Sequence, residues 1–152
     1  MIKPTKANYL DVIIFLLVLL FIYAATSKLI AFDQFQAQIS KSPLIMNHTK
    51  IISIIVPSLE ILISALLLIP KTQQIGLYAS FTLMFMFTSY ISFILTFSPH
   101  VPCSCGGILS SMGWTEHLIF NIFFTLVTMI GIRINSSKVN HIETNKPEIS
   151  VY

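Results

Sequence analysis

Four long apolar segments follow one another along the chain, separated by short polar connections. They cover residues 10–31, 51–69, 75–97 and 114–134. Each has about 19 to 23 residues, which is the length an α-helix needs to cross a hydrocarbon layer of about 30 Å. The pattern predicts an all-α, polytopic membrane protein whose single domain, residues 1–134, is a bundle of four transmembrane helices.

The first apolar segment follows a short basic start with Lys3 and Lys6, and this combination also describes a secretory signal peptide. The stretch Tyr23-Ala24-Ala25-Thr26 is a poor match to the small residues that a cleavage site requires, and three more apolar segments follow it. We therefore expect the first span to be retained.

The polar connection between the first two spans contains Phe32, Phe35 and Ile39 at helical spacing. Two interpretations are open for it: a short helix on the membrane surface, or an ordinary loop with a few buried aromatic side chains. Residues 135–152 are polar, and we expect them to form a disordered tail.

The composition excludes an ordinary soluble domain. Hydrophobic residues make up 55% of the chain and charged residues only 10%, whereas about a quarter of a soluble domain is charged. The net charge of +3 is mild and its basic residues are scattered around the apolar segments. They are therefore topology signals rather than a nucleic-acid-binding patch, and the lipid bilayer is the expected environment.

The distribution of lysine and arginine predicts the orientation, because these residues concentrate on the cytoplasmic side. With both termini inside, the inner segments hold Lys3, Lys6, Lys71, Arg133, Lys138 and Lys146, and the outer ones hold only Lys28, Lys41 and Lys50. Both termini, and the polar tail, are thus predicted to be cytoplasmic. The connection 98–113 is predicted to be extracytoplasmic.

That connection carries the chain's only two cysteines, within Pro102-Cys103-Ser104-Cys105-Gly106-Gly107. Outside the cytoplasm disulfides form and persist. A disulfide between Cys103 and Cys105 closes a small, strained ring, and strain raises the reduction potential and favours exchange. A redox pair is our first interpretation, and inert loop cysteines are an alternative. A soft-metal site for Cu(I), with Cys103, Cys105 and His100 or His117 as ligands, is another.

A second candidate is Glu60, at the centre of the second span, where a carboxylate costs several kcal/mol unless it is paired, hydrated or protonated. Three roles are open: a proton relay, binding of a quinone head group, or a neutral hydrogen bond to a neighbouring helix. Lys28 is its partner only if Glu60 lies closer to the surface than its position in the span indicates. We expect Lys28 to extend to the interface instead.

The entry of the fourth span provides three further candidates for proton relay or quinone binding. His117 and Asn121 are four residues apart and share one helix face, and Trp114 precedes them. His117 is suited to activating a nearby thiol. The plainer interpretation makes Trp114 an interfacial anchor and His117 a polar residue at the water line.

With these residues in view, the chain resembles the MauE/DoxX group of small bacterial membrane proteins, and its MauE-like methylamine-utilisation branch in particular. The resemblance covers all four spans. It depends most on the cysteine motif with Trp114, His117 and Asn121, and less on Pro57-Xaa-Xaa-Glu60 and on Thr26-Ser27-Lys28-Leu29 followed by Phe32 and Phe35.

The resemblance implies a redox-associated protein of the bacterial inner membrane that works beside periplasmic thioredoxin-like proteins or disulfide-containing clients. The DoxX branch is linked to quinone-dependent sulfur oxidation. In outline the chain is also similar to the quinone-linked disulfide generators of the DsbB and vitamin K epoxide reductase type. Those use two cysteine pairs, and this chain has one, so autonomous catalysis is in question.

The sequence thus predicts a thiol–disulfide exchange component that uses Cys103 and Cys105, with quinone as a possible electron acceptor. Two other classes remain open: a non-catalytic assembly or maturation factor for a periplasmic partner, and a copper-binding protein.

Overall fold

The computed structural model describes residues 6–40, 48–97 and 113–144. They form five helices, which are α1 (Lys6–Ile30), α2 (Phe32–Ser40), α3 (Thr49–Leu68), α4 (Gln73–Phe97) and α5 (Trp114–Thr144). No β-strand occurs within these ranges. Four helices are long and apolar enough to cross a membrane, over Asn8–Ile30, Thr49–Leu68, Gln73–Phe97 and Thr115–Ser137. The predicted all-α architecture with four spans is confirmed.

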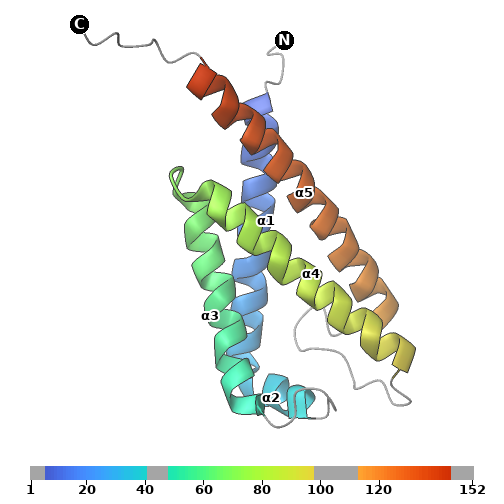
Figure 1. Ribbon diagram of the computed structural model, residues 1–152. Coiled ribbons are helices and arrows are strands. Elements are labelled where there is room, and N and C mark those ends of the chain that lie inside the picture. The colour runs from blue at the N-terminus through green and yellow to red at the C-terminus, as the bar shows by residue number, and fades with distance from the viewer. Residues whose placement is uncertain (1–5, 41–47, 98–112, 145–152) are drawn as a thin grey trace, which may run out of the picture.

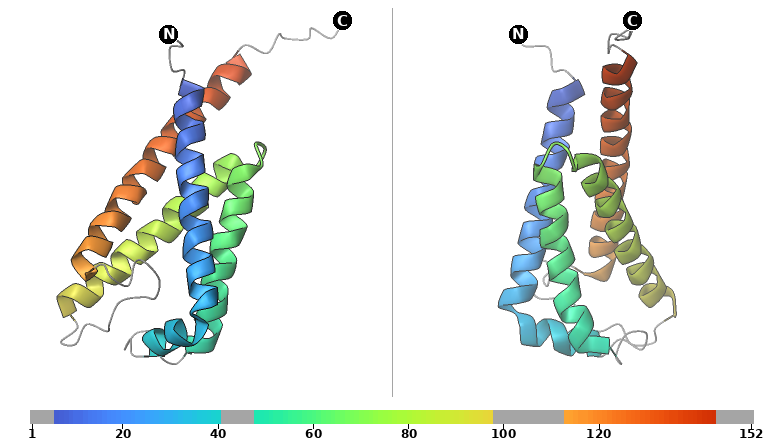
Figure 2. Two further views of the ribbon diagram at one scale, coloured as in Figure 1. Left: turned by 180° about the vertical axis from the view of Figure 1, so that it is seen from behind. Right: turned by 60° about the vertical axis from the view of Figure 1, so that its left-hand side comes forward.

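The four long helices pack as two pairs, α1 with α3 and α4 with α5, and α4 also contacts α3 while α5 contacts α1. Figures 1 and 2 show the start of α1 and the end of α5 at one end of the bundle. The short helix α2 lies at the opposite end, together with the start of α3, the end of α4 and the start of α5. We call this the α2 end. The start of α1 and the end of α5 lie at the same end of the bundle, as an even number of spans requires. That this end faces the cytoplasm stays a prediction.

One stripe of α1 forms the centre of the core. Leu10, Ile14, Leu17 and Phe21, spaced by three or four residues, are between 0% and 6% exposed. They pack against residues of α3 and α4, namely Ile63, Leu67, Leu77, Leu83 and Met84. Other apolar residues of α1, such as Phe15, are exposed. In a bilayer those side chains contact lipid, so the helix is apolar on both faces.

The connection between α3 and α4, residues 69–72, is a tight turn. Thr72 Oγ1 donates a hydrogen bond to the Leu66 carbonyl at 2.9 Å, and Gln73 Nε2 donates one to the Leu67 carbonyl at 3.3 Å. These bonds satisfy two carbonyls at the end of α3 that have no partner within the helix. Gly76 allows α4 to approach α3, because a Cβ there would lie 3.0 Å from the Leu67 nitrogen.

The first part of the polar connection after α1, residues 32–40, is a helix, as the first of the two interpretations of its sequence predicts. Phe35 and Ile39 are 7% and 6% exposed, and α2 contacts α3. The apolar side chains of α2 are therefore covered by protein. Its location at a membrane surface stays a prediction.

Helix α5 continues to Thr144, so residues 135–144, which the pattern assigns to a polar tail, are helical. Asn135 is buried, and its Nδ2 donates to Oε1 of Gln74 at the start of α4. Gln74 Nε2 donates to Ser136 Oγ at 3.2 Å. This polar contact between helices gives the end of the fourth span a tertiary partner, which hydropathy alone does not reveal.

Candidate functional site

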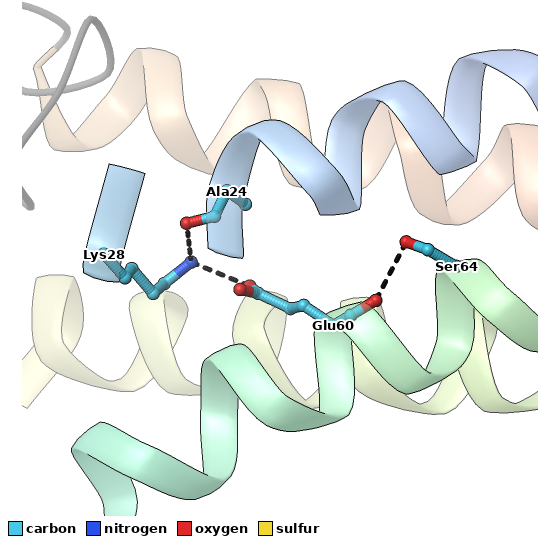
Figure 3. A network of polar contacts seen from close by, with 4 residues as sticks. All are labelled: Ala24, Lys28, Glu60 and Ser64. Carbon is cyan, nitrogen blue, oxygen red and sulfur yellow. Dashed lines mark hydrogen bonds and ion pairs between the residues drawn. The ribbon is translucent and has the colours of Figure 1, made fainter. Parts of the chain in front are cut away.

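The main polar feature within the spans is an ion pair between α1 and α3. Lys28 Nζ lies 2.7 Å from Glu60 Oε1, and Figure 3 shows the two side chains extended toward each other. The Glu60 side chain is 1% exposed and that of Lys28 17%. Lys28 Nζ also lies 3.4 Å from the Ala24 carbonyl, one turn earlier in α1. The contact is a charge-assisted hydrogen bond in a surrounding of low dielectric constant.

The sequence of α3 positions Glu60 toward α1. Its buried residues recur every three or four positions, at Ser53, Pro57, Glu60, Ile63, Ser64 and Leu67. Ser64 Oγ donates to the Glu60 backbone carbonyl at 2.9 Å, so this neighbour does not solvate the carboxylate (Figure 3). The carboxylate is therefore held on the protein-facing side of an apolar helix, with the lysine as its principal partner.

Two aromatic rings complete the surroundings of the cation. Lys28 Nζ lies 5.9 Å from the ring centroid of Phe35 in α2 and 5.9 Å from that of Phe87 in α4. At this distance the negative face of each ring attracts the ammonium group. Lys28 is thus held by a carboxylate and two rings from three different helices.

The second carboxylate oxygen of Glu60 is in a different situation. Glu60 Oε2 is buried and has no hydrogen-bond partner among the described residues. A buried acceptor without a partner is uncommon and costs free energy, more so when it carries charge. Only one of the two carboxylate oxygens of Glu60 therefore has a hydrogen-bond partner within the described part of the chain.

The pairing corrects our expectation for Lys28. We expected its side chain to extend to the interface, and it points to Glu60 instead. Lys28 is close to the end of α1 and Glu60 is in the middle of α3, and the long lysine side chain bridges the difference in depth. The pairing could have been inferred from the two opposite charges on apolar helices, because an unpaired charge is costly within a membrane.

Helix α5 places His117 and Asn121 on one face, as their spacing predicts. Asn121 is 4% exposed, and its Nδ2 donates to the His117 carbonyl at 2.9 Å. His117 is half-buried near the α2 end, within electrostatic range of the Lys28 ammonium. Trp114 begins α5. The structure thus brings His117 toward Lys28, a relation the sequence analysis did not propose.

Cys103, Cys105 and His100 lie outside the described residues, so their proposed roles stay predictions. The described helices that flank their segment, α4 and α5, meet it at the α2 end. Within the described ranges no three His, Cys, Asp or Glu side chains are grouped so that they could hold a metal ion.

The model of one protein family, methylamine utilisation protein MauE, matches residues 6–134. The chain belongs to the MauE family. The match includes all four spans, the Lys28–Glu60 pair, both cysteines, His117 and Asn121. No curated protein and no solved structure shows a significant match. MauE membership and the four long apolar helices support a multi-pass membrane protein.

Proposed function

We propose that this MauE-family protein is a membrane thiol–disulfide exchange component. The observation that carries the proposal is the pair Cys103 and Cys105, the chain's only cysteines, one residue apart in the segment that joins two spans. Strain in so small a disulfide ring favours exchange over permanent cross-linking. The MauE match supports the proposal in one respect, since it fits a membrane protein in methylamine utilisation.

The exchange step balances without any other reagent when the partner supplies a disulfide. The thiolate of Cys103 attacks one partner sulfur and forms a mixed disulfide, and the other partner sulfur leaves as a thiolate. Cys105 then attacks Cys103, which releases the partner as a dithiol and leaves the Cys103–Cys105 disulfide. Two electrons pass to the partner, and the reverse sequence oxidises it.

The proposed partner is a periplasmic thioredoxin-like protein or a disulfide-containing client, because the lysine and arginine distribution favours cytoplasmic termini and an extracytoplasmic cysteine segment. The proposed location is the bacterial inner membrane. A membrane quinone is the proposed electron acceptor when the dithiol is reoxidised: it takes two electrons and two protons and becomes a quinol. His117 and Asn121, near the α2 end, are the proposed polar contacts for its head group, with Trp114 beside them.

A maturation factor without redox chemistry is the second candidate. The presence of one cysteine pair, rather than two, favours it. In that case a protein lacking both thiols retains its function, while disruption of the bundle abolishes it. The third candidate is a copper-binding protein. In that case the reduced wild type binds copper stoichiometrically, and a Cys103→Ala variant does not.

The reduction potential of the cysteine pair tests the proposal. The purified protein in lipid is equilibrated with glutathione buffers, and the fraction of disulfide is measured by thiol labelling. We expect a potential between about −270 and −120 mV, the range of thiol–disulfide exchange enzymes. A value below about −300 mV describes a structural disulfide and contradicts the proposal. Ser104→Ala is the matched control, because it changes the loop and keeps both thiols.

A further inference from the structure

Three other helices each place a side chain beside Lys28 of α1. These side chains are Phe35 of α2, Glu60 of α3 and Phe87 of α4. His117 of α5 is within electrostatic range of the Lys28 charge. The thiol chemistry proposed above uses neither Lys28 nor Glu60. The cluster therefore needs an explanation of its own.

Holding α1 against α3 is an insufficient explanation. A buried ion pair recovers the cost of removing its charges from water only when the remaining lone pairs are also hydrogen-bonded. Glu60 Oε2 has no such bond within the described part of the chain. Apolar or hydroxyl side chains join membrane helices without that cost, and the neighbouring contacts of α1 with Ile63 and Leu67 are of this kind.

We propose that Glu60 Oε2 is a proton-binding atom, and that the Lys28–Glu60 pair is a two-state proton switch within the membrane. In the ionic state the ammonium and the carboxylate together have zero net charge. Uptake of one proton from water forms an O–H bond at Oε2. The carboxyl group becomes neutral, the ammonium loses its counter-ion, and the net charge of the site rises by one.

The surroundings suit the protonated state as well. The cation remains in contact with the faces of Phe35 and Phe87 and close to the Ala24 carbonyl. Lys28 lies in the last turn of α1, from which a long side chain reaches the interface. Protonation therefore weakens the polar link between α1 and α3, and proton occupancy is coupled to the packing of these two helices.

The acidic and basic side chains of the helices around the pair bear on the route by which a proton reaches it. Asp33 of α2, Lys50 of α3 and Glu116 of α5 are exposed. Helix α4 contains no acidic or basic residue. His117 alone among these groups is half-buried and within range of the Lys28 charge. We assign His117 the role of proton carrier between water at the α2 end and the Lys28–Glu60 pair, and the variant His117→Phe tests this part of the proposal.

Infrared spectroscopy of the full chain in lipid vesicles tests the switch without using the thiols. The variant Glu116→Gln/Glu143→Gln/Glu148→Gln leaves Glu60 as the only glutamate. Labelling glutamate with carbon-13 at the side-chain carboxyl then gives Glu60 a distinct carbonyl band. We expect the band of the protonated acid to replace the carboxylate band reversibly as the pH is lowered.

Two further variants test what Lys28 and His117 contribute to proton binding at Glu60. In Lys28→Met the carboxylate loses its counter-ion, so we expect the protonated band to persist to a pH at least about one unit higher, a tenfold change in proton affinity. In His117→Phe we expect the pH midpoint of Glu60 protonation to stay unchanged and the exchange of protons between Glu60 and water to become slower. Asp33→Asn is the control and leaves both properties unchanged.

A carboxylate band that persists at every pH at which the protein remains helical overturns the inference, and Glu60 is then a permanent ion-pair partner or is solvated by a fixed water. An unchanged midpoint in Lys28→Met also overturns it. The labelled protein keeps Lys28 and Glu60, so the inference is tested even if substitutions at these positions prevent folding. If the glutathione titration gives the low potential of a structural disulfide, it contradicts the proposed thiol–disulfide exchange and leaves the proton switch untouched.

Discussion

Glu60 and Lys28 are separated by 32 residues in sequence and form a 2.7 Å ion pair across the interface between α1 and α3. The pair links an acid in the middle of one span to a base in the last turn of another. Each charge alone would be costly in the hydrocarbon region. The two residues therefore depend on each other, and the cost of disrupting them is testable.

Removing only Lys28 should be more harmful than removing both members of the pair. Lys28→Met is expected to lower the free energy of unfolding by about 3–5 kcal/mol at a pH where Glu60 is ionised, because it leaves a buried carboxylate without its partner. Glu60→Gln is expected to cost less, because Lys28 keeps its contacts with Phe35, Phe87 and the Ala24 carbonyl. The double variant should recover most of the loss in Lys28→Met. Unfolding in mixed micelles, monitored by circular dichroism, measures the difference.

Lys71→Met is the matched control for this comparison, because Lys71 is exposed in the turn between α3 and α4. It should change the stability by less than about 0.5 kcal/mol. Additive losses in the double variant would show that the two charges do not stabilise each other.

Gly76 and Gly131 offer a second test, which concerns packing. A Cβ at Gly76 would lie 3.0 Å from the Leu67 backbone nitrogen and 3.1 Å from the Leu66 carbonyl carbon, which cannot move independently. A Cβ at Gly131 would lie 3.1 Å from Ile13 Cγ2 and 3.2 Å from Leu77 Cδ2, which are the ends of side chains. Gly76→Ala should therefore cost about 1–3 kcal/mol, and Gly131→Ala should cost less.

The same unfolding measurement distinguishes the two substitutions. Equal losses would mean that the contact of α4 with α3 is looser than the structure has it. A larger loss for Gly131→Ala would mean that the interface between α1 and α5 is the stiffer one.

The spans could be predicted from sequence because their signal is local: each apolar run is long enough to cross a bilayer and is bounded by polar residues. Glu60 could be identified as a candidate for the same reason, as an acid inside such a run. Its partner could not be identified. The pairing with Lys28 depends on how α1 and α3 are aligned in depth, and this alignment is fixed by contacts such as those of Leu17 and Leu67 rather than by any local pattern.

The extension of α5 shows the same limit. Asn135 is polar and follows the last apolar residues, so hydropathy ends the span near residue 134. The contact of Asn135 with Gln74 joins α5 to the start of α4, so the helix continues. A local pattern does not report a hydrogen bond between residues that are 61 positions apart.

The aromatic contacts of Lys28 give a third prediction. Phe87→Leu keeps an apolar side chain but removes the ring face, 5.9 Å from Nζ. We expect a loss of about 0.5–2 kcal/mol in stability, the range for a cation over an aromatic ring. In the Lys28→Met background the same substitution should cost less, and unfolding of the four proteins of this double-mutant cycle measures the coupling.

Phe85→Leu is the control for this cycle, because Phe85 is 56% exposed in the same helix. A coupling between Phe87 and Lys28 no larger than that between Phe85 and Lys28 would contradict a specific contact.

The last prediction concerns orientation, on which the proposed redox chemistry depends. Cys103 and Cys105 are predicted to face the periplasm, where disulfides persist. In intact bacteria with permeabilised outer membranes, an impermeant maleimide should label both thiols after reduction. The variant Lys71→Cys/Cys103→Ala/Cys105→Ala has a single cysteine, at residue 71, which should be labelled only after the inner membrane is opened.

Residue 71 is in the turn between α3 and α4, and the connection with the native cysteines joins α4 to α5. The two positions therefore flank opposite ends of α4. Labelling of residue 71 in intact cells, with protection of Cys103 and Cys105, would invert the topology and place the thiols in the reducing cytoplasm, where a periplasmic exchange partner cannot reach them.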